Sequence, residues 1–293
     1  MRRLYLLSLL VLAATASAQQ DFSKVEIKVQ KVSGGIYMLT GAGGNIGVSV
    51  GEDGVIVIDD QYAPLVPKIE AAIRSITPKA VRYIVNTHYH GDHTGGNEQM
   101  GKTVPIIAQE NVRHRLVSGT TVFGQSTPPA PKSALPVITF DHSLSLHLNG
   151  EEVRAVHMPH GHTDGDAVIY FTQSNVVHMG DDFFNGMFPF VDMDNGGSVR
   201  GMIASVDTVI ATVPEDVKVI PGHGPLSDKN GLRAFSDVLK GVVAAIQRGI
   251  DAGKSVEQLK TEKVLGAWDA TWGQGFIKTD MFTEMVYREL TKK

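Results

Sequence analysis

Apolar positions in the first part of the chain follow two different periods. Short apolar or alternating runs between glycine-rich turns predict strands, and an apolar residue at every third or fourth position after Pro64 predicts a helix. The predicted strands span 26–32, 36–40, 45–50, 55–59 and 81–86, and the predicted helix spans 64–76. These elements indicate one sheet with a helix against it.

The second part of the chain returns to strands and helices in the same order, without repeating the sequence. The predicted strands span 105–108, 137–140, 143–148, 153–158, 167–172, 176–179 and 217–220, and the predicted helices span 109–118, 199–211, 229–252 and 280–290. Strands and a helix, twice in succession, predict the α/β class, with two sheets packed face to face and helices outside. We expect one domain over residues 19–293.

Residues 119–136 interrupt this order. The segment holds four prolines and is too rich in them for regular structure to be expected. A long loop inside a compact domain is usually functional. We therefore expect this segment to form a wall of a substrate cleft, with Phe123 as an apolar contact.

The N-terminus has the features of a secretory leader. Two arginines precede the apolar run 4–14, and Ala16-Ser17-Ala18 offers a cleavage site. The run is shorter than the roughly 20 apolar residues that a membrane-spanning helix needs. We expect residues 1–18 to be a signal peptide and the mature chain to be periplasmic or secreted, without a stable membrane anchor.

Composition narrows the possible partners. The chain has no cysteine, so neither a disulfide nor a thiolate zinc site is possible. Removing Arg2 and Arg3 with the leader takes the formal charge from -4 to -6, because the leader carries no acid. This acidity argues against nucleic acid and leaves a small-molecule substrate as the expected partner. The oligomeric state is open.

The segment after the predicted strand 81–86 concentrates metal-binding side chains. His88, His90, Asp92 and His93 fall within six positions, in front of two glycines. Successive side chains of an extended backbone point to opposite faces, so His88 and His90 share one face and can reach one cation. Gly91 lets the chain turn, which directs Asp92 and His93 toward a second position. Imidazole and carboxylate suit zinc best, with iron or manganese as alternatives.

This His-x-His-x-Asp-His stretch resembles the signature of the metallo-β-lactamase superfamily. The resemblance implies three further motifs, and the chain has them in order: His162 in a Gly-His-Thr-Asp-Gly stretch, Asp181 after a strand, and His223 in Pro-Gly-His-Gly-Pro. It also implies a four-layer αβ/βα sandwich.

The resemblance further implies a ligand set and a mechanism. His88, His90 and His162 would hold one zinc, Asp92, His93 and His223 a second, and Asp181 would bridge them. Zinc lowers the pKa of bound water to about 7, so a hydroxide would attack a carbonyl. Asp92 would orient that hydroxide or pass its proton to the leaving group.

Several assignments stay open on the sequence. Asp59 matches an acid that supports the metal ligands in the family, or it caps the following helix. Residues 41–44 form either a mobile hairpin over the site or a simple tight turn. His162 is preferred to His160 as a ligand because Thr163, Asp164 and Gly165 follow it as in the family pattern.

Asp181 bears on the substrate class. It matches the metal-bridging acid of glyoxalase II-type thioester hydrolases, whereas in cysteine-free β-lactamases this residue is not a direct ligand. The lysine that holds the lactam carboxylate in some β-lactamases is missing, although Arg200 or Lys229 could replace it.

We therefore expect an exported binuclear zinc hydrolase of a β-lactam or a similar cyclic amide or ester. A thioester hydrolase of the glyoxalase II type, a non-haem iron enzyme of sulfur metabolism and a metal-stabilised binding protein are the alternatives.

Overall fold

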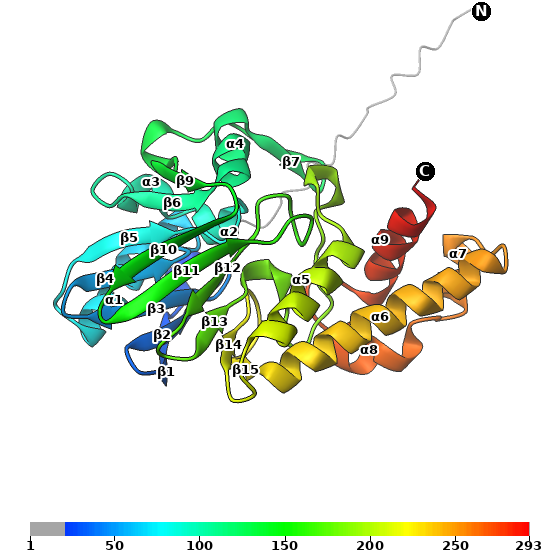
Figure 1. Ribbon diagram of the computed structural model, residues 1–293. Helices are drawn as coiled ribbons and strands as arrows, with labels where there is room; N and C mark the ends of the chain where they lie inside the picture. The colour runs from blue at the N-terminus through cyan, green and yellow to red at the C-terminus, as the bar shows by residue number, and fades with distance from the viewer. Residues whose placement is uncertain (1–20, 293) are drawn as a thin grey trace, which may run out of the picture.

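The computed structural model describes residues 21–292, so the expected leader at 1–18 lies outside the described residues. Two large sheets form the centre of the molecule (Figure 1). In sheet order, the first holds β1 (Lys28–Ser33), β2 (Ile36–Thr40), β3 (Ile46–Gly51), β4 (Gly54–Ile58), β5 (Val81–Val85), β6 (Ile106–Gln109) and β9 (Ile138–Phe140). Neighbours are antiparallel from β1 to β4 and parallel from β4 to β9.

The second sheet is mostly antiparallel and contains one parallel pair, β13 with β14. Its strands, in order, are β10 (Ser143–Leu148), β11 (Glu151–His157), β12 (Ala167–Phe171), β13 (Val176–His178), β14 (Lys218–Ile220) and β15 (Ser227–Asp228). The helices are α1 (Val66–Ile76), α2 (Gly91–Thr94), α3 (Asn97–Met100), α4 (Glu110–Ser118), α5 (Val199–Thr212), α6 (Lys229–Asp251), α7 (Val256–Thr261), α8 (Gly266–Trp272) and α9 (Thr279–Thr291).

Strand β4 shows how the sequence builds the layers. All five of its residues are buried, which fits a central strand covered on both faces. Ile56 and Ile58 join the core between the two sheets, whereas Val55 and Val57 pack with α1 on the opposite face. Because successive side chains alternate between faces, one apolar run serves two cores.

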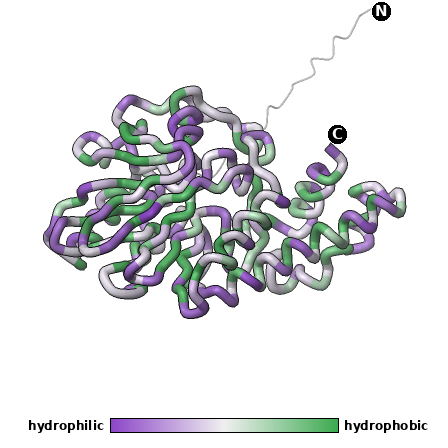
Figure 2. Tube along the Cα trace, in the orientation of Figure 1, coloured by the Kyte–Doolittle hydropathy of each residue, from purple (hydrophilic) through white to green (hydrophobic). Residues whose placement is uncertain are grey.

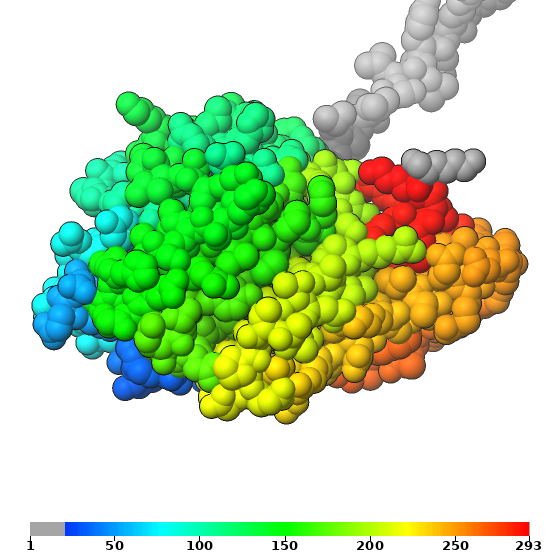
Figure 3. All heavy atoms as spheres, in the orientation of Figure 1, coloured from blue at the N-terminus to red at the C-terminus, as the bar shows by residue number. Residues whose placement is uncertain are grey.

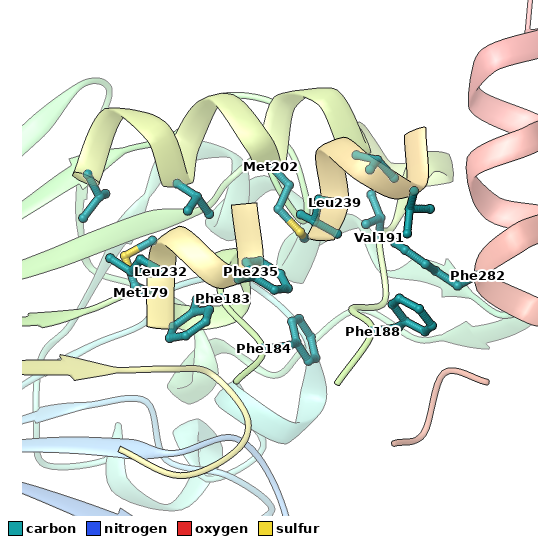
Figure 4. Close-up of a cluster of buried hydrophobic side chains, with 14 of the residues drawn as sticks. Met179, Phe183, Phe184, Phe188, Val191, Met202, Leu232, Phe235, Leu239 and Phe282 are labelled. Atoms are coloured by element: carbon teal, nitrogen blue, oxygen red, sulfur yellow. The ribbon is translucent and has the colours of Figure 1, made fainter. Parts of the chain in front are cut away.

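The outer face of the second sheet is covered by α5 and α6, and α9 packs against α6 (Figure 1). Figure 4 shows Phe183, Leu232 and Phe235 among the buried side chains of this layer. Helix α6 alternates hydrophobic and hydrophilic segments in Figure 2, as expected for a helix with one buried face. The order helix, sheet, sheet, helix confirms the expected four-layer sandwich.

The C-terminal region contains more structure than the sequence pattern predicted. Helices α7 and α8 were not expected, and β15 adds a short edge to the second sheet. Glu289 of α9 accepts hydrogen bonds from the first residues of α5, including the backbone N–H of Val199 at 2.6 Å. Figure 3 shows the red C-terminal segment against the yellow-green part of the chain that contains α5.

The prediction of no regular structure for residues 119–136 is wrong for part of the segment. Strands β7 (Thr120–Val122) and β8 (Gln125–Thr127) form a hairpin, and Lys132–Ala134 form a 3-10 turn. The hairpin turns at Phe123 and Gly124, whose φ angles of 51° and 72° match a two-residue turn with both residues left-handed. The prolines follow the hairpin, so they do not interrupt its pairing.

No helix among residues 21–292 is long and apolar enough to cross a membrane. The expected metal-binding residues follow the carboxyl ends of β5 in the first sheet and of β11, β13 and β14 in the second. The two sheets therefore place residues from distant parts of the sequence at one edge of the sandwich.

Replacing Phe235 by alanine should lower the free energy of unfolding by about 3–5 kcal/mol, because the ring is fully buried and its removal leaves a cavity. Urea denaturation followed by circular dichroism measures the change. Asp237→Ala, at an exposed position of the same helix, should alter it by less than about 0.5 kcal/mol. Equal losses in both variants would contradict the packing of α6 against the core.

Candidate metal centre

The histidine-rich segment is not extended as expected. Strand β5 ends at Val85, residues 87–89 form a bend, and α2 begins at Gly91 with His90 as its N-cap. Tyr89 turns into the core beside Ala108 and Val112, while the rings of His88 and His90 meet with centroids 4.9 Å apart. The two histidines therefore converge through a bend, not through the alternation of a strand.

All seven expected ligands lie together. His88, His90, His162 and Asp181 form one group, and Asp92, His93 and His223 form another, with the possible ligand atoms of each group within 4.8 Å of one another. Asp181 also faces the second group: its Oδ1 lies 3.1 Å from His93 Nε2, and its Oδ2 lies 3.4 Å from His223 Nε2. The carboxylate of Asp181 thus stands between the two groups.

Asp59 fixes the orientation of two of these histidines. Its Oδ2 accepts a hydrogen bond from His93 Nδ1 at 2.7 Å and another from Thr87 Oγ1 at 2.7 Å. Because the Thr87 hydroxyl donates to Asp59, it accepts from His88 Nδ1 at 3.0 Å. His88 then carries its proton on Nδ1, whereas Asp181, Asp92 and Asp59 raise the pKa of His93 despite its burial, so His93 must lose its Nε2 proton before it can bind a metal. Asp59 does not cap α1, whose N-cap is Leu65.

The other two histidines of the first group are held in the same way. His90 Nε2 donates to Asp192 Oδ2 at 3.0 Å, and His162 Nδ1 donates to the carbonyl of Phe190 at 2.8 Å. Their remaining nitrogens, His90 Nδ1 and His162 Nε2, lie 2.8 Å apart. Two lone pairs at this distance repel each other unless a cation lies near both.

Asp192 is a functional residue that the sequence pattern did not reveal. Besides His90, its carboxylate binds the hydroxyl of Tyr89 and the side-chain amide of Asn195. The signal that the sequence offered was a single acid in the otherwise apolar stretch 188–193, and the structure shows that this acid is buried.

His160 lies outside the cluster. Its ring is exposed and its Nδ1 lies 3.1 Å from the carbonyl oxygen of Gly196. Asp182 points away from the cluster and accepts hydrogen bonds from the His162 backbone N–H and from Ser205. It therefore supports the loop that carries His162.

The turn at residues 41–44 lies directly on the site. The N–H of Gly44 donates to the carbonyl of Asp92 at 3.1 Å, and a Cβ added at Gly44 would come within 2.1 Å of the His93 ring. Only glycine leaves room for this approach.

Of the two proposed substitutes for a lactam-binding lysine, Lys229 is not free for that role. Lys229 is buried and donates to the carbonyl of Val213 at 2.7 Å, and it pairs with Glu215 at 2.8 Å. Arg200 is exposed at the start of α5, on the outer layer of the sandwich.

The charges of the cluster suit a metal ion. Burial lowers the pKa of His162 to about 4 and also lowers that of His88, so both are neutral ligands at pH 7. Burial opposes ionisation of Asp92, but His93 and His223 hold its pKa at about 2. Burial likewise disfavours charge on His223, yet Asp181 and Asp92 raise its pKa to about 9.

Two buried atoms in the cluster have no hydrogen-bond partner, His88 Nε2 and Asp181 Oδ1. An unpaired buried nitrogen and carboxylate oxygen cost free energy unless a cation satisfies them. The donor set of imidazole nitrogens and carboxylate oxygens is one that binds divalent metals. The residues present therefore fit a metal cofactor.

Sequence and fold comparisons agree with this geometry. The sequence model of the metallo-beta-lactamase superfamily matches residues 39–223, which is more than half of the chain. The protein belongs to this superfamily and is a hydrolase of its metal-dependent kind.

Among curated relatives, a probable metallo-hydrolase of Bacillus subtilis is 26% identical over 161 residues, covering 53% of this chain and 72% of the relative. A probable hydroxyacylglutathione hydrolase of Schizosaccharomyces pombe is 29% identical over 148 residues, and the match covers 49% of this chain and 48% of the relative. The chain therefore matches about half the length of that hydrolase.

Solved structures share the fold. A metallo-beta-lactamase from Pontibacter korlensis aligns with a TM-score of 0.61 at 18% identity, over 73% of this chain and 99% of that one. A sec-alkylsulfatase from Pseudomonas aligns with a TM-score of 0.66 at 16% identity, over 90% of this chain and 50% of that one.

Asp192→Asn should weaken metal binding about 10- to 100-fold. The asparagine amide can donate its N–H to His90 Nε2, which would move the ring proton to Nδ1, the nitrogen that faces the metal site. Competition with a chromophoric chelator measures the affinity. Asp194→Asn is the matched control, since Asp194 is exposed and pairs with Arg288. If Asp194→Asn weakens binding as much as Asp192→Asn, the role given to Asp192 is wrong.

Metal binding to Asp92, His93 and His223 should strengthen as the pH rises. The pKa of His223 in the metal-free protein is about 9, so below that pH an incoming metal must displace a proton. His88 and His162 have lowered pKa values and are already neutral at pH 7, so they add little pH dependence. Calorimetric titration in buffers of different ionisation enthalpy counts the protons released. Metal uptake at pH 7 without proton release would contradict these charge states.

Proposed function

We propose that the protein is an exported binuclear zinc hydrolase that cleaves a carbonyl substrate with an activated water. The observation that carries this proposal is the position of Asp181 between two groups of ligands. His88, His90 and His162 would hold one zinc, Asp92, His93 and His223 would hold the second, and Asp181 would bridge them. Export rests on the leader-like N-terminal sequence, and a periplasmic or secreted location follows from it.

Zinc bound at such a site lowers the pKa of a water ligand to about 7 and polarises a carbonyl oxygen. The residues of the chain prepare the site for this chemistry. Asp59, Asp192 and the Phe190 carbonyl hold four imidazoles in the tautomers that bind metal.

Asp92 and His223 lie on the open side of the centre. Each side chain keeps 25% of its surface exposed, whereas that of Asp181 keeps 4%. Substrate would therefore approach past these two residues. With a pKa of about 2, Asp92 is ionised at neutral pH, so its carboxylate would accept a hydrogen bond from the attacking water and orient it.

The geometry favours a thioester or ester over the β-lactam expected from the sequence. A bridging Asp181 matches the glyoxalase II arrangement, and the Schizosaccharomyces relative bears the name of a hydroxyacylglutathione hydrolase. Lys229 is buried and paired with Val213 and Glu215, so it does not supply the missing lactam-binding cation. Cyclic amides and esters stay in the substrate panel as the second candidate.

Asp181→Ala should remove a ligand shared by both metals and lower turnover by about a hundredfold or more. Metal analysis after dialysis should fall from about two zinc ions per chain to about one or fewer. Turnover is measured on a panel of thioesters, aryl esters, lactones and β-lactams. Asp216→Ala is the control, because Asp216 is exposed and bonds only Asn175 among the contacts described.

An Asp181→Ala variant that keeps two zinc ions and full turnover would contradict the bridging role. Iron in place of zinc in the purified wild-type protein would instead favour the non-haem iron alternative.

A further inference from the structure

Three phenylalanine rings form a continuous row of contacts that ends beside the metal centre. Phe276 and Phe123 meet edge to face with centroids 5.8 Å apart, and Phe123 stacks on Phe190 at 4.2 Å. Phe190 in turn lies 5.7 Å from the rings of both His90 and His162. We call Phe123, Phe190 and Phe276 the aromatic shelf.

Core packing does not explain the shelf. Phe276 is 75% exposed and Phe123 is 51% exposed, although burial of aromatic rings is normally favourable. Phe123 also has a φ of 51°, a left-handed conformation that is unusual for a bulky residue and costs free energy. Its ring is exposed and stacks on Phe190, which itself contacts the rings of His90 and His162, and this placement points to a binding role.

The hairpin that carries Phe123 is tied to the metal ligands. The side-chain amide of Asn195 donates to the carbonyl of Thr121 at 3.1 Å in β7 and to Asp192 at 2.9 Å. Asp192 holds His90, so a short chain of hydrogen bonds connects the hairpin to a ligand. The position of Phe123 relative to the metal centre is therefore fixed at its base.

Phe276 comes from a part of the chain beyond the superfamily match, which ends at residue 223. The N–H of Phe188 donates to the carbonyl of Trp272 at 2.8 Å, and a Cβ added at Gly275 would lie 2.8 Å from Met187. This close packing holds the segment that contains Phe276 against the stretch that contains Phe190. The C-terminal region thus contributes a residue to the surroundings of the site.

We propose that the aromatic shelf binds an aromatic or branched aliphatic group of the substrate while its carbonyl lies at the metal centre. The identity of the reacting carbonyl rests on the proposed function; the shelf itself rests on the three rings. The rings offer no hydrogen-bond partner to a polar group, so the group they bind is apolar. A thioester or ester with an apolar acyl chain fits better than one with a charged peptide-like chain.

Binding of 4-phenylbutyrate and butyrate to the zinc-loaded protein, measured by calorimetry, tests the shelf without catalysis. We expect the phenyl compound to bind about tenfold more tightly. The double variant Phe123→Ala/Phe276→Ala should lose this difference, and both positions are exposed enough for the fold to tolerate the change. Val137→Ala, at a 70% exposed apolar position just before β9, should keep it.

Hydrolysis of 4-nitrophenyl phenylacetate and 4-nitrophenyl acetate separates the two proposals. The wild type should prefer the phenylacetate by about tenfold in kcat/KM, the double variant should lose this preference, and Val137→Ala should keep both the preference and the acetate rate. If neither ester is cleaved but the binding difference is present and disappears in the double variant, the hydrolase proposal is wrong and the shelf stands. Equal binding of both acids by the wild type, or a difference that survives in the double variant, overturns the shelf.

Discussion

Both ligand groups of the metal centre depend on the hydrogen bonds that the Asp59 carboxylate accepts. It is fully buried and accepts from the Thr87 backbone N–H, the Thr87 hydroxyl and the His93 ring. Through Thr87 it also determines the tautomer of His88. One side chain from the end of β4 thus orients a ligand of each group, and its loss would leave several buried donors unpaired.

The rest of the molecule places this carboxylate. Asp59 has a φ of 64°, and its N–H donates to the Val85 carbonyl at 2.9 Å. The chain therefore turns directly after the carboxyl end of β4. The second sheet brings Asp181 and His223 to the same edge from the ends of β13 and β14. The core between the sheets holds these strand ends together, so the metal centre depends on packing far from the ligands.

The fold class and the ligands at 88–93 could be predicted from short stretches of sequence, whereas His162, Asp181 and His223 were expected from the resemblance to the superfamily. Strand and helix periods are visible in short windows, and the clustered histidines stand out against them. Asp192 could not be found in this way, because its partner His90 lies 102 positions earlier and only the fold brings them together. The same holds for Phe276, because only the fold brings it to Phe123, which the sequence did suggest as an apolar contact.

The missed hairpin, the missed helix α7 and the unexpected bend each have a cause in the local sequence or its surroundings. The hairpin at 120–127 was hidden by the prolines that follow it and by a Phe-Gly turn where Asn-Gly would be usual. Helix α7 was missed although Ser255 and Gln258 form a capping box, because the helix has only six residues. Residues 87–89 bend because Tyr89 packs into the core. His88 and His90 still face the same site, although the backbone is not the extended strand that was predicted.

The most direct test of this account is a crystal structure of the zinc-loaded protein with diffraction data collected on both sides of the zinc absorption edge. The account predicts two anomalous peaks, one among His88, His90 and His162 and one among Asp92, His93 and His223, with Asp181 contacting both. A single peak, or two peaks of which Asp181 contacts neither, would contradict it.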